Sequence, residues 1–266
     1  MKASPQARTA ANAQKSAIGA HTPLKPFKRQ SANRTYIGIR ERSWIPNSGA
    51  RQTLHLGAEK ALDIIEAATH ARLIGLPFNL ALCIHFGAGN LKPHYRAQHA
   101  IHYFWKGATK WLSRKGIPAT FVWVLEHDVG NGRPNGTGLH VHILMHCPEQ
   151  YQEAFTKLAE TKWLLSAGMD SRDPSTFKAS EYRVGPSGEP QAYFDNYKTA
   201  LAYLLKGMNP EEPLPKVTGD DRPFAQWLGI QDTLKPNLPI SGRRMSRSQN
   251  ITKTARDRYH AKQSAK

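Results

Sequence analysis

The chain has 266 residues, a formal net charge of +17 and a sequence pI of about 10.0, which favours a polyanionic partner, most commonly nucleic acid. No apolar run approaches the ~18 residues that a membrane-spanning helix needs, and no signal-peptide pattern opens the chain, so we expect a cytoplasmic protein without a membrane partner. Two cysteines, Cys83 and Cys147, cannot form a four-cysteine zinc module and are expected to be reduced packing residues.

Composition divides the chain into three regions. Residues 1–34 contain Lys and Arg but no Asp or Glu, and are predicted to form a disordered basic arm, although organelle transit peptides share this composition. Residues 35–230 carry the periodic segments of one domain. Residues 231–266 are basic again and are predicted to be a flexible, phosphate-binding tail, with DNA-binding candidates Arg243, Arg244 and Arg247.

Apolar periodicity predicts an α+β fold, with one central antiparallel sheet and helices packed mainly on one face. The expected elements, in chain order, are a strand over 34–42, a helix over 57–73, a strand over 78–86, a helix over 94–115, strands over 120–125 and 138–146, a helix over 149–167, a strand or hairpin near 181–184, and a helix over 192–206. The strand over 78–86 is nearly all apolar, so we expect both of its faces to be covered.

The strand over 138–146 separates its residues into two faces with a period of two. Leu139, Val141, Ile143 and Met145 lie on one face, and His140, His142 and His146 lie on the other. Imidazoles at positions i and i+2 project side by side and can chelate one divalent metal ion. The alternative is an edge strand whose histidines are solvated.

Glu126 ends the preceding strand, and a hairpin-like loop would place it opposite His140 and His142. One carboxylate and two imidazoles leave coordination positions open, as a catalytic metal site requires, and this mixed set suits manganese or another first-row metal better than magnesium. His127 and Asp128 are alternative third ligands.

Two further groups are candidates for chemistry. His99 and His102 share a face of the helix over 94–115 and form a second possible metal pair, but no acidic residue accompanies them. On the helix over 192–206, Tyr203 and Lys206 share a face at i and i+3, and Tyr193 and Tyr197 share another face. Core packing with a solvated hydroxyl is the alternative for these tyrosines.

The ordered set of Glu126, His140-Val141-His142 and Tyr203-Leu204-Leu205-Lys206 resembles the HUH endonucleases, and among them the rolling-circle replication initiators. The resemblance covers roughly residues 78–206. It implies a ferredoxin- or RRM-like sheet and a divalent metal ion (Mn or Mg) on Glu126, His140 and His142. It also implies that Tyr203 is a nucleophile assisted by Lys206, and that single-stranded DNA is cleaved through a 5′-phosphotyrosine. The loop before His140 is longer than in many initiators, which keeps His127 and Asp128 open as ligands.

The order of the motifs separates this chain from conjugative relaxases, whose nucleophilic tyrosine precedes the histidines, because Tyr36 is the only tyrosine before residue 95. No phosphate-binding Gly-x-x-x-x-Gly-Lys-Ser/Thr run is present, so we expect a host helicase to act in trans at the replication origin of a plasmid or phage. The alternatives are an HUH-type transposase, a non-catalytic nucleic-acid-binding module with an RRM-like sheet, and a metal-dependent hydrolase with water as nucleophile.

Overall fold

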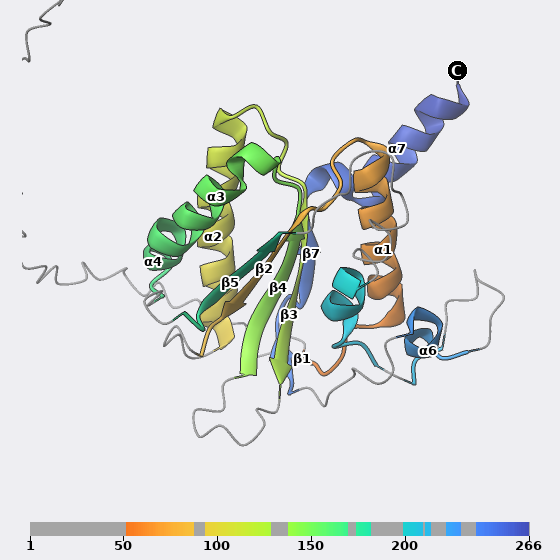
Figure 1. Ribbon diagram of the computed structural model, residues 1–266. Coiled ribbons are helices and arrows are strands. Elements are labelled where there is room, and N and C mark those ends of the chain that lie inside the picture. Colours follow the sequence, from red (N-terminus) through yellow and green to blue (C-terminus); the bar gives the residue numbers. More distant parts are fainter. Residues whose placement is uncertain are drawn as a thin grey trace, which may run out of the picture. The chain divides into compact units, whose positions relative to one another are not determined.

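The computed structural model describes residues 52–87, 94–128, 138–169, 174–181, 199–209, 211–213, 222–229 and 238–265. The fold belongs to the unit Ile45–Lys266. Its elements are β1 (Gln52–Thr53), α1 (Ala58–Leu73), β2 (Leu80–His85), α2 (His94–Arg114), β3 (Phe121–Asp128), β4 (Gly138–Met145), α3 (Glu149–Leu158), the π-helix η1 (Ala159–Trp163), α4 (Leu164–Ser166), β5 (Phe177–Glu181), α6 (Phe224–Leu228), β6 (Ile240–Ser241), β7 (Met245–Arg247), the 3-10 helix η4 (Gln249–Ile251) and α7 (Lys253–Ser264) (Figure 1). A further helix spans 199–205.

Within the described residues, five strands form one antiparallel sheet in the order β5-β2-β4-β3-β7. The histidine strand β4 is therefore central, with β2 and β3 on either side. A separate two-stranded sheet pairs β1 with β6. The predicted α+β fold with a central antiparallel sheet is confirmed. The predicted basic arm over residues 1–34 and the strand over 34–42 lie outside the described residues.

One face of the sheet packs against α2, α3, η1 and α4 (Figure 1). This core is built from alternating strand residues, including Leu82, Leu125 and Val141, and from helix residues such as Phe104 and Phe155, all almost fully buried. The π-helix interrupts the helix predicted over 149–167, and its Trp163 lies against Gly107 of α2, where any Cβ would come within 2.5 Å of the indole. Glycine at this position allows the close approach of the two helices.

The other face, which carries the histidines, is also partly covered by helices. Val122, Val124 and Leu144 of the sheet pack with residues of α1 and of the helix over 199–205, among them Ile64 and Leu204. The sequence-based prediction had helices mainly on one face of the sheet. In the structure, α1 and the helix over 199–205 also pack on the histidine face, because β3 and β4 carry apolar residues there too. They leave the histidine part of β4 beside the end of the helix over 199–205.

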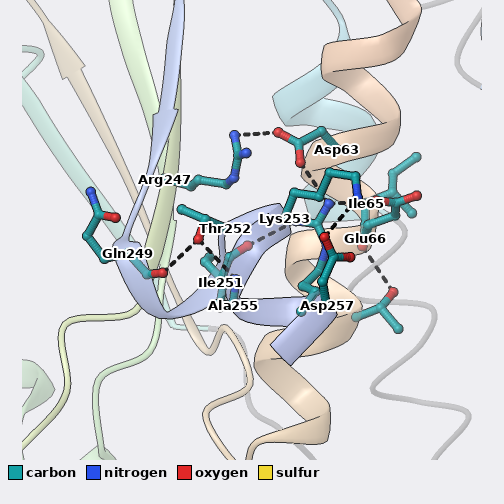
Figure 2. Close-up of polar contacts among 12 residues, drawn as sticks. Asp63, Ile65, Glu66, Arg247, Gln249, Ile251, Thr252, Lys253, Ala255 and Asp257 are labelled. Atoms are coloured by element: carbon teal, nitrogen blue, oxygen red, sulfur yellow. Dashed lines mark hydrogen bonds and ion pairs between the residues drawn. The ribbon is translucent and has the colours of Figure 1, made fainter. Parts of the chain in front are cut away.

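The C-terminal region is ordered from residue 238 to residue 265, so the prediction of a flexible tail over 231–266 is wrong for this segment. Arg256 of α7 is buried and donates hydrogen bonds to Asp63 Oδ1 at 2.9 Å, to Glu66 Oε2 at 2.6 Å and to the Ile251 carbonyl at 3.0 Å. Arg247 of β7 forms an ion pair with the same Asp63 (Figure 2). The acidic side chains of α1 therefore hold basic residues that, in the sequence alone, look solvated.

We expect Arg256→Ala to lower the free energy of unfolding by about 2 kcal/mol, because a buried guanidinium with three acceptors would be lost. Urea denaturation measures this change. The matched control is Lys253→Ala, which breaks the ion pair with Asp257, whose two side chains are 75% and 61% exposed. That variant should leave the free energy of unfolding nearly unchanged. Equal effects of the two substitutions would contradict the assigned role of Arg256.

Candidate functional site

The register of β3 and β4 brings Glu126, His140 and His142 to one point on the sheet. Glu126 lies directly opposite His140, and both side chains project to the same face as His142. His140 Nε2 and His142 Nε2 lie 3.2 Å and 3.3 Å from Glu126 Oε2. One ligand atom from each residue lies within 4.8 Å of the others, and all three residues are buried. The structure thus assembles the predicted group, which could hold a metal ion.

Hydrogen bonding around these three residues fits a cation ligand set. His140 Nδ1 donates to the Gly138 carbonyl at 2.5 Å, which leaves Nε2 as the nitrogen that can accept a hydrogen bond or coordinate a cation, and Lys206 Nζ lies 3.4 Å from it. Both carboxylate oxygens of Glu126 and Nε2 of His142 are buried; within the described residues Oε1 has no hydrogen-bond partner, whereas Oε2 is ion-paired with Lys206 Nζ at 3.0 Å. Buried polar atoms normally have partners, so converging atoms of this kind match the donor set of a bound divalent cation.

The register also decides between the candidate third ligands. His127 lies opposite Leu139, so it projects to the face that packs against α2. Asp128 shares the face of Glu126 but lies opposite Gly138, further along the hairpin. Among the described residues, Glu126, His140 and His142 are the ones whose ligand atoms converge.

Electrostatics keep the ligands in the forms that bind metal. Burial would raise the pKa of Glu126, but the close approach of the two imidazoles and the positive charge of Lys206 outweigh it, so the pKa lies well below its usual range. Burial lowers the pKa of His142 to about 4, although the carboxylate of Glu126 opposes this effect. Near neutral pH the site therefore presents a carboxylate and a neutral His142 ring.

Tyr203 and Lys206 lie beside this group. The helix over 199–205 buries Leu204 and Leu205 in the core and leaves Tyr203 55% exposed. The Tyr203 ring contacts the His142 ring at 4.5 Å between centroids. Lys206 Nζ is 4.5 Å from the centre of the Tyr203 ring and 3.0 Å from Glu126 Oε2. The structure thus brings all five of the predicted catalytic and metal residues together.

The tyrosine is a protonated phenol at neutral pH. Burial raises the pKa of Tyr203, and the neighbouring charge of Lys206 opposes that rise. The pKa of Lys206 is itself raised, because the negative charge of Glu126 outweighs burial. Tyr193 and Tyr197, the other tyrosines of the predicted helix, lie outside the described residues.

Arg244 has a structural role, which contradicts its prediction as a DNA-binding residue. Its side chain is buried, and Nη1 donates to the Leu54 carbonyl at 2.7 Å and to the Gly207 carbonyl at 3.5 Å. Gly207 follows Lys206 and lies against the carboxylate, since a Cβ there would be 3.2 Å from Glu126 Oε1. Of the other two predicted residues, Arg247 is paired with Asp63, whereas Arg243 is exposed.

Sequence reasoning missed two residues of β2 that border the site. Cys83 lies opposite His142 and His85 lies opposite His140. The His85 ring stacks on the His140 ring with centroids 5.1 Å apart, and Cys83 Sγ is 3.3 Å from His85 Nε2. Burial raises the pKa of Cys83 to about 12 and lowers that of His85 to about 4, so both groups are neutral. The sequence feature that could have identified them is their i, i+2 spacing, which puts both side chains on one face of an otherwise apolar strand.

The second histidine pair, His99 and His102, lies on the exposed side of α2, and both rings contact Tyr103. This helix packs on the sheet face opposite Glu126, so the pair belongs to a different surface.

Within the part of the chain that the structure describes, no helix is long and apolar enough to cross a membrane. Comparisons of the chain with protein-family models, curated proteins and solved structures found no match.

Metal binding can be tested with manganese. We expect Glu126→Gln and His142→Ala each to weaken Mn²⁺ affinity at least about 100-fold in calorimetric titration, because each removes one of three ligands. His127→Ala is the matched control, since this buried histidine projects to the opposite face, and its Mn²⁺ affinity should be unchanged. Loss of Mn²⁺ binding in the control with retention in His142→Ala would show that the ligand face is wrong.

Proposed function

We propose that the chain is an HUH-type endonuclease that nicks and rejoins single-stranded DNA through a covalent 5′-phosphotyrosine, as rolling-circle replication initiators do. The observation that supports this most is the contact of Tyr203 with His142 and of Lys206 with Glu126. Three sequence motifs, far apart in the chain, meet in the combination that this chemistry requires. A purely structural tyrosine would not explain an exposed phenol beside a buried metal-ligand group.

The proposed reaction is a transesterification at phosphorus. Tyr203 Oη attacks the phosphorus and loses its proton, a new P–O bond forms to the tyrosine, and the bond from phosphorus to O3′ breaks. The departing O3′ takes a proton and becomes a free 3′-hydroxyl. Attack by that hydroxyl on the phosphotyrosine reverses the sequence and rejoins the strand. Because the phosphotyrosine keeps the energy of the broken bond, joining needs no nucleotide cofactor.

The residues around Tyr203 supply the electrostatics of this reaction. A divalent cation, Mn²⁺ or Mg²⁺, held by Glu126, His140 and His142 would neutralise the non-bridging phosphate oxygens. Lys206, whose Nζ is 4.5 Å from the centre of the Tyr203 ring, would stabilise the phenolate as the proton leaves. The ion pair with Glu126 Oε2 positions the Lys206 ammonium between carboxylate and phenol.

The substrate and setting follow from the same proposal. The net charge of +17 suits a nucleic-acid partner, and single-stranded DNA at a replication origin of a plasmid or phage is the proposed substrate. A host helicase would supply strand separation in trans in the cytoplasm, since the sequence carries no nucleotide-binding motif. An HUH-type transposase would use the same chemistry on the ends of a mobile element.

A non-catalytic RRM-like module is less consistent with the sheet. Such modules stack bases on exposed aromatic side chains of their strands. Here Phe121 and Trp123 of β3 pack with α2, on the face opposite the histidines. The face that would bind nucleic acid instead carries the ligand group and Tyr203.

The nucleophile can be tested by substitution. We expect Tyr203→Phe to reduce the covalent protein–DNA adduct, formed with single-stranded DNA and Mn²⁺, by more than about 1,000-fold, because the attacking oxygen is lost. Mn²⁺ and DNA affinities should persist. Tyr197→Phe is the matched control on the same predicted helix and should retain the adduct. Peptide mapping that finds the nucleotide on Tyr193 or Tyr197 would refute the assignment, and hydrolysis without any adduct would favour water as nucleophile.

The role of Lys206 gives a separate test. We expect Lys206→Met to slow adduct formation about 100-fold and to shift its pH profile to higher pH, because removing the ammonium raises the pKa of Tyr203. The same variant should bind Mn²⁺ more tightly, since a positive charge 3.0 Å from Glu126 Oε2 repels the metal. Lys178→Met removes an equal charge from the exposed surface of neighbouring β5 and is the control. An unshifted pH profile in Lys206→Met would contradict this role.

A further inference from the structure

Helix α2 presents an exposed basic stripe that takes no part in the site described above. Its 21 residues include no Asp or Glu. The α2 stripe consists of side chains spaced three or four residues apart, which therefore share one helix face: Arg96, His99, Tyr103, Lys106, Lys110 and Arg114. All are exposed except Tyr103, which is partly buried. A helix face with four cationic side chains and no acidic one is unusual for a solvated helix, where charges of both signs normally alternate.

The α2 stripe and the candidate metal group lie on opposite sides of the sheet. The other face of α2, with Ile101, Phe104 and Leu112, is buried against the sheet residues Leu125 and Val141. Glu126, His140 and His142 project from the opposite side of the same strands. Figure 1 shows α2 and α1 on the two sides of the sheet. The stripe is therefore a surface separate from the one that carries Tyr203.

We propose that the α2 stripe binds the phosphate backbone of double-stranded DNA. From Arg96 to Arg114 the helix rises about 27 Å, at ~1.5 Å per residue, which is comparable with the ~34 Å of one duplex turn. An α-helix of this kind fits along or into the major groove, which is ~12 Å wide. The exposed Arg243 adds positive charge near the N-terminal end of the stripe, because Gln98 of α2 donates to the carbonyls of Ser241 and Arg243.

The composition of the α2 stripe favours a duplex over a single strand. Single-strand surfaces hold successive bases on a series of exposed aromatic rings. This stripe offers two rings, those of Tyr103 and His99, and they contact each other at 4.5 Å between centroids rather than forming a series along the helix. Lys106 Nζ lies 6.0 Å from the centre of the Tyr103 ring. The four cationic side chains of the stripe are thus better suited to the phosphates of a duplex than to stacked bases.

The choice of DNA as the ligand rests on the proposed function. Binding to the α2 stripe is measured under conditions in which no DNA is cleaved. The full chain is mixed with a 30-base-pair duplex and a chelator, and affinity is measured over a range of salt concentrations. We expect the triple variant Lys106→Gln, Lys110→Gln, Arg114→Gln to bind the duplex at least about tenfold more weakly and to lower the logarithmic salt slope by about 2.7, or ~0.9 per lost phosphate contact. Its adduct with single-stranded DNA should be unchanged.

The control is the triple variant Lys60→Gln, Arg258→Gln, Lys262→Gln, which removes an equal charge from exposed positions on α1 and α7. Its duplex affinity should change less than about twofold. Equal losses in the two triple variants would show a nonspecific effect of net charge and overturn the proposal. Tighter binding of an RNA duplex of the same sequence would overturn the choice of DNA.

Two further readouts separate this inference from the proposed function. Circular dichroism checks folding, and if the triple variant is unfolded, the single variants should each lower the slope by about 0.9. Single variants with an unchanged slope would refute the proposal. If the wild-type protein forms no adduct, and the stripe variant but not the control variant loses duplex affinity, the proposed function is refuted and the duplex surface stands.

Discussion

The buried negative charge of Glu126 is the constraint on which the rest of the site depends. A carboxylate that is 1% exposed costs several kcal/mol to bury unless cations or hydrogen-bond donors surround it. Nitrogen atoms of His140, His142 and Lys206 all lie between 3.0 and 3.3 Å from its Oε2. The helix over 199–205 must therefore end beside the sheet, and this end is held by Arg244, which donates to the carbonyl of Gly207.

The antiparallel register fixes which side chains meet the carboxylate. Because side chains alternate along a strand, a slip of β3 by one residue would turn His127 to the site and Glu126 to the core. The apolar face opposes this slip, since Leu125, Val141 and their neighbours form a buried apolar cluster under α2, where an unpaired charge would be costly. Packing on one face of the sheet thus sets the chemistry of the other, and the proposed catalytic centre depends on a core with which it shares no side chain.

Local patterns were enough to predict the parts of the structure that repeat with the period of a strand or helix. The alternation of Leu139 to Met145 with His140 and His142 identified the central strand and its two faces, and the hairpin placed Glu126 opposite them. Contacts between distant segments could not be predicted from these local patterns. The docking of α7 depends on Asp63 and Glu66, about 190 residues before Arg256, and the position of His85 depends on how β2 pairs with β4. Sequence alone gives charge and spacing, but neither of these tertiary partners.

The most direct test of the account is the position of a metal ion in crystals of the full chain grown with Mn²⁺. We predict an anomalous scattering peak within coordination distance of Nε2 of His140, Nε2 of His142 and a carboxylate oxygen of Glu126, with the remaining coordination positions turned towards Tyr203. A peak on His127 or Asp128, or the absence of any peak at this group in crystals that hold Mn²⁺ elsewhere, would contradict it.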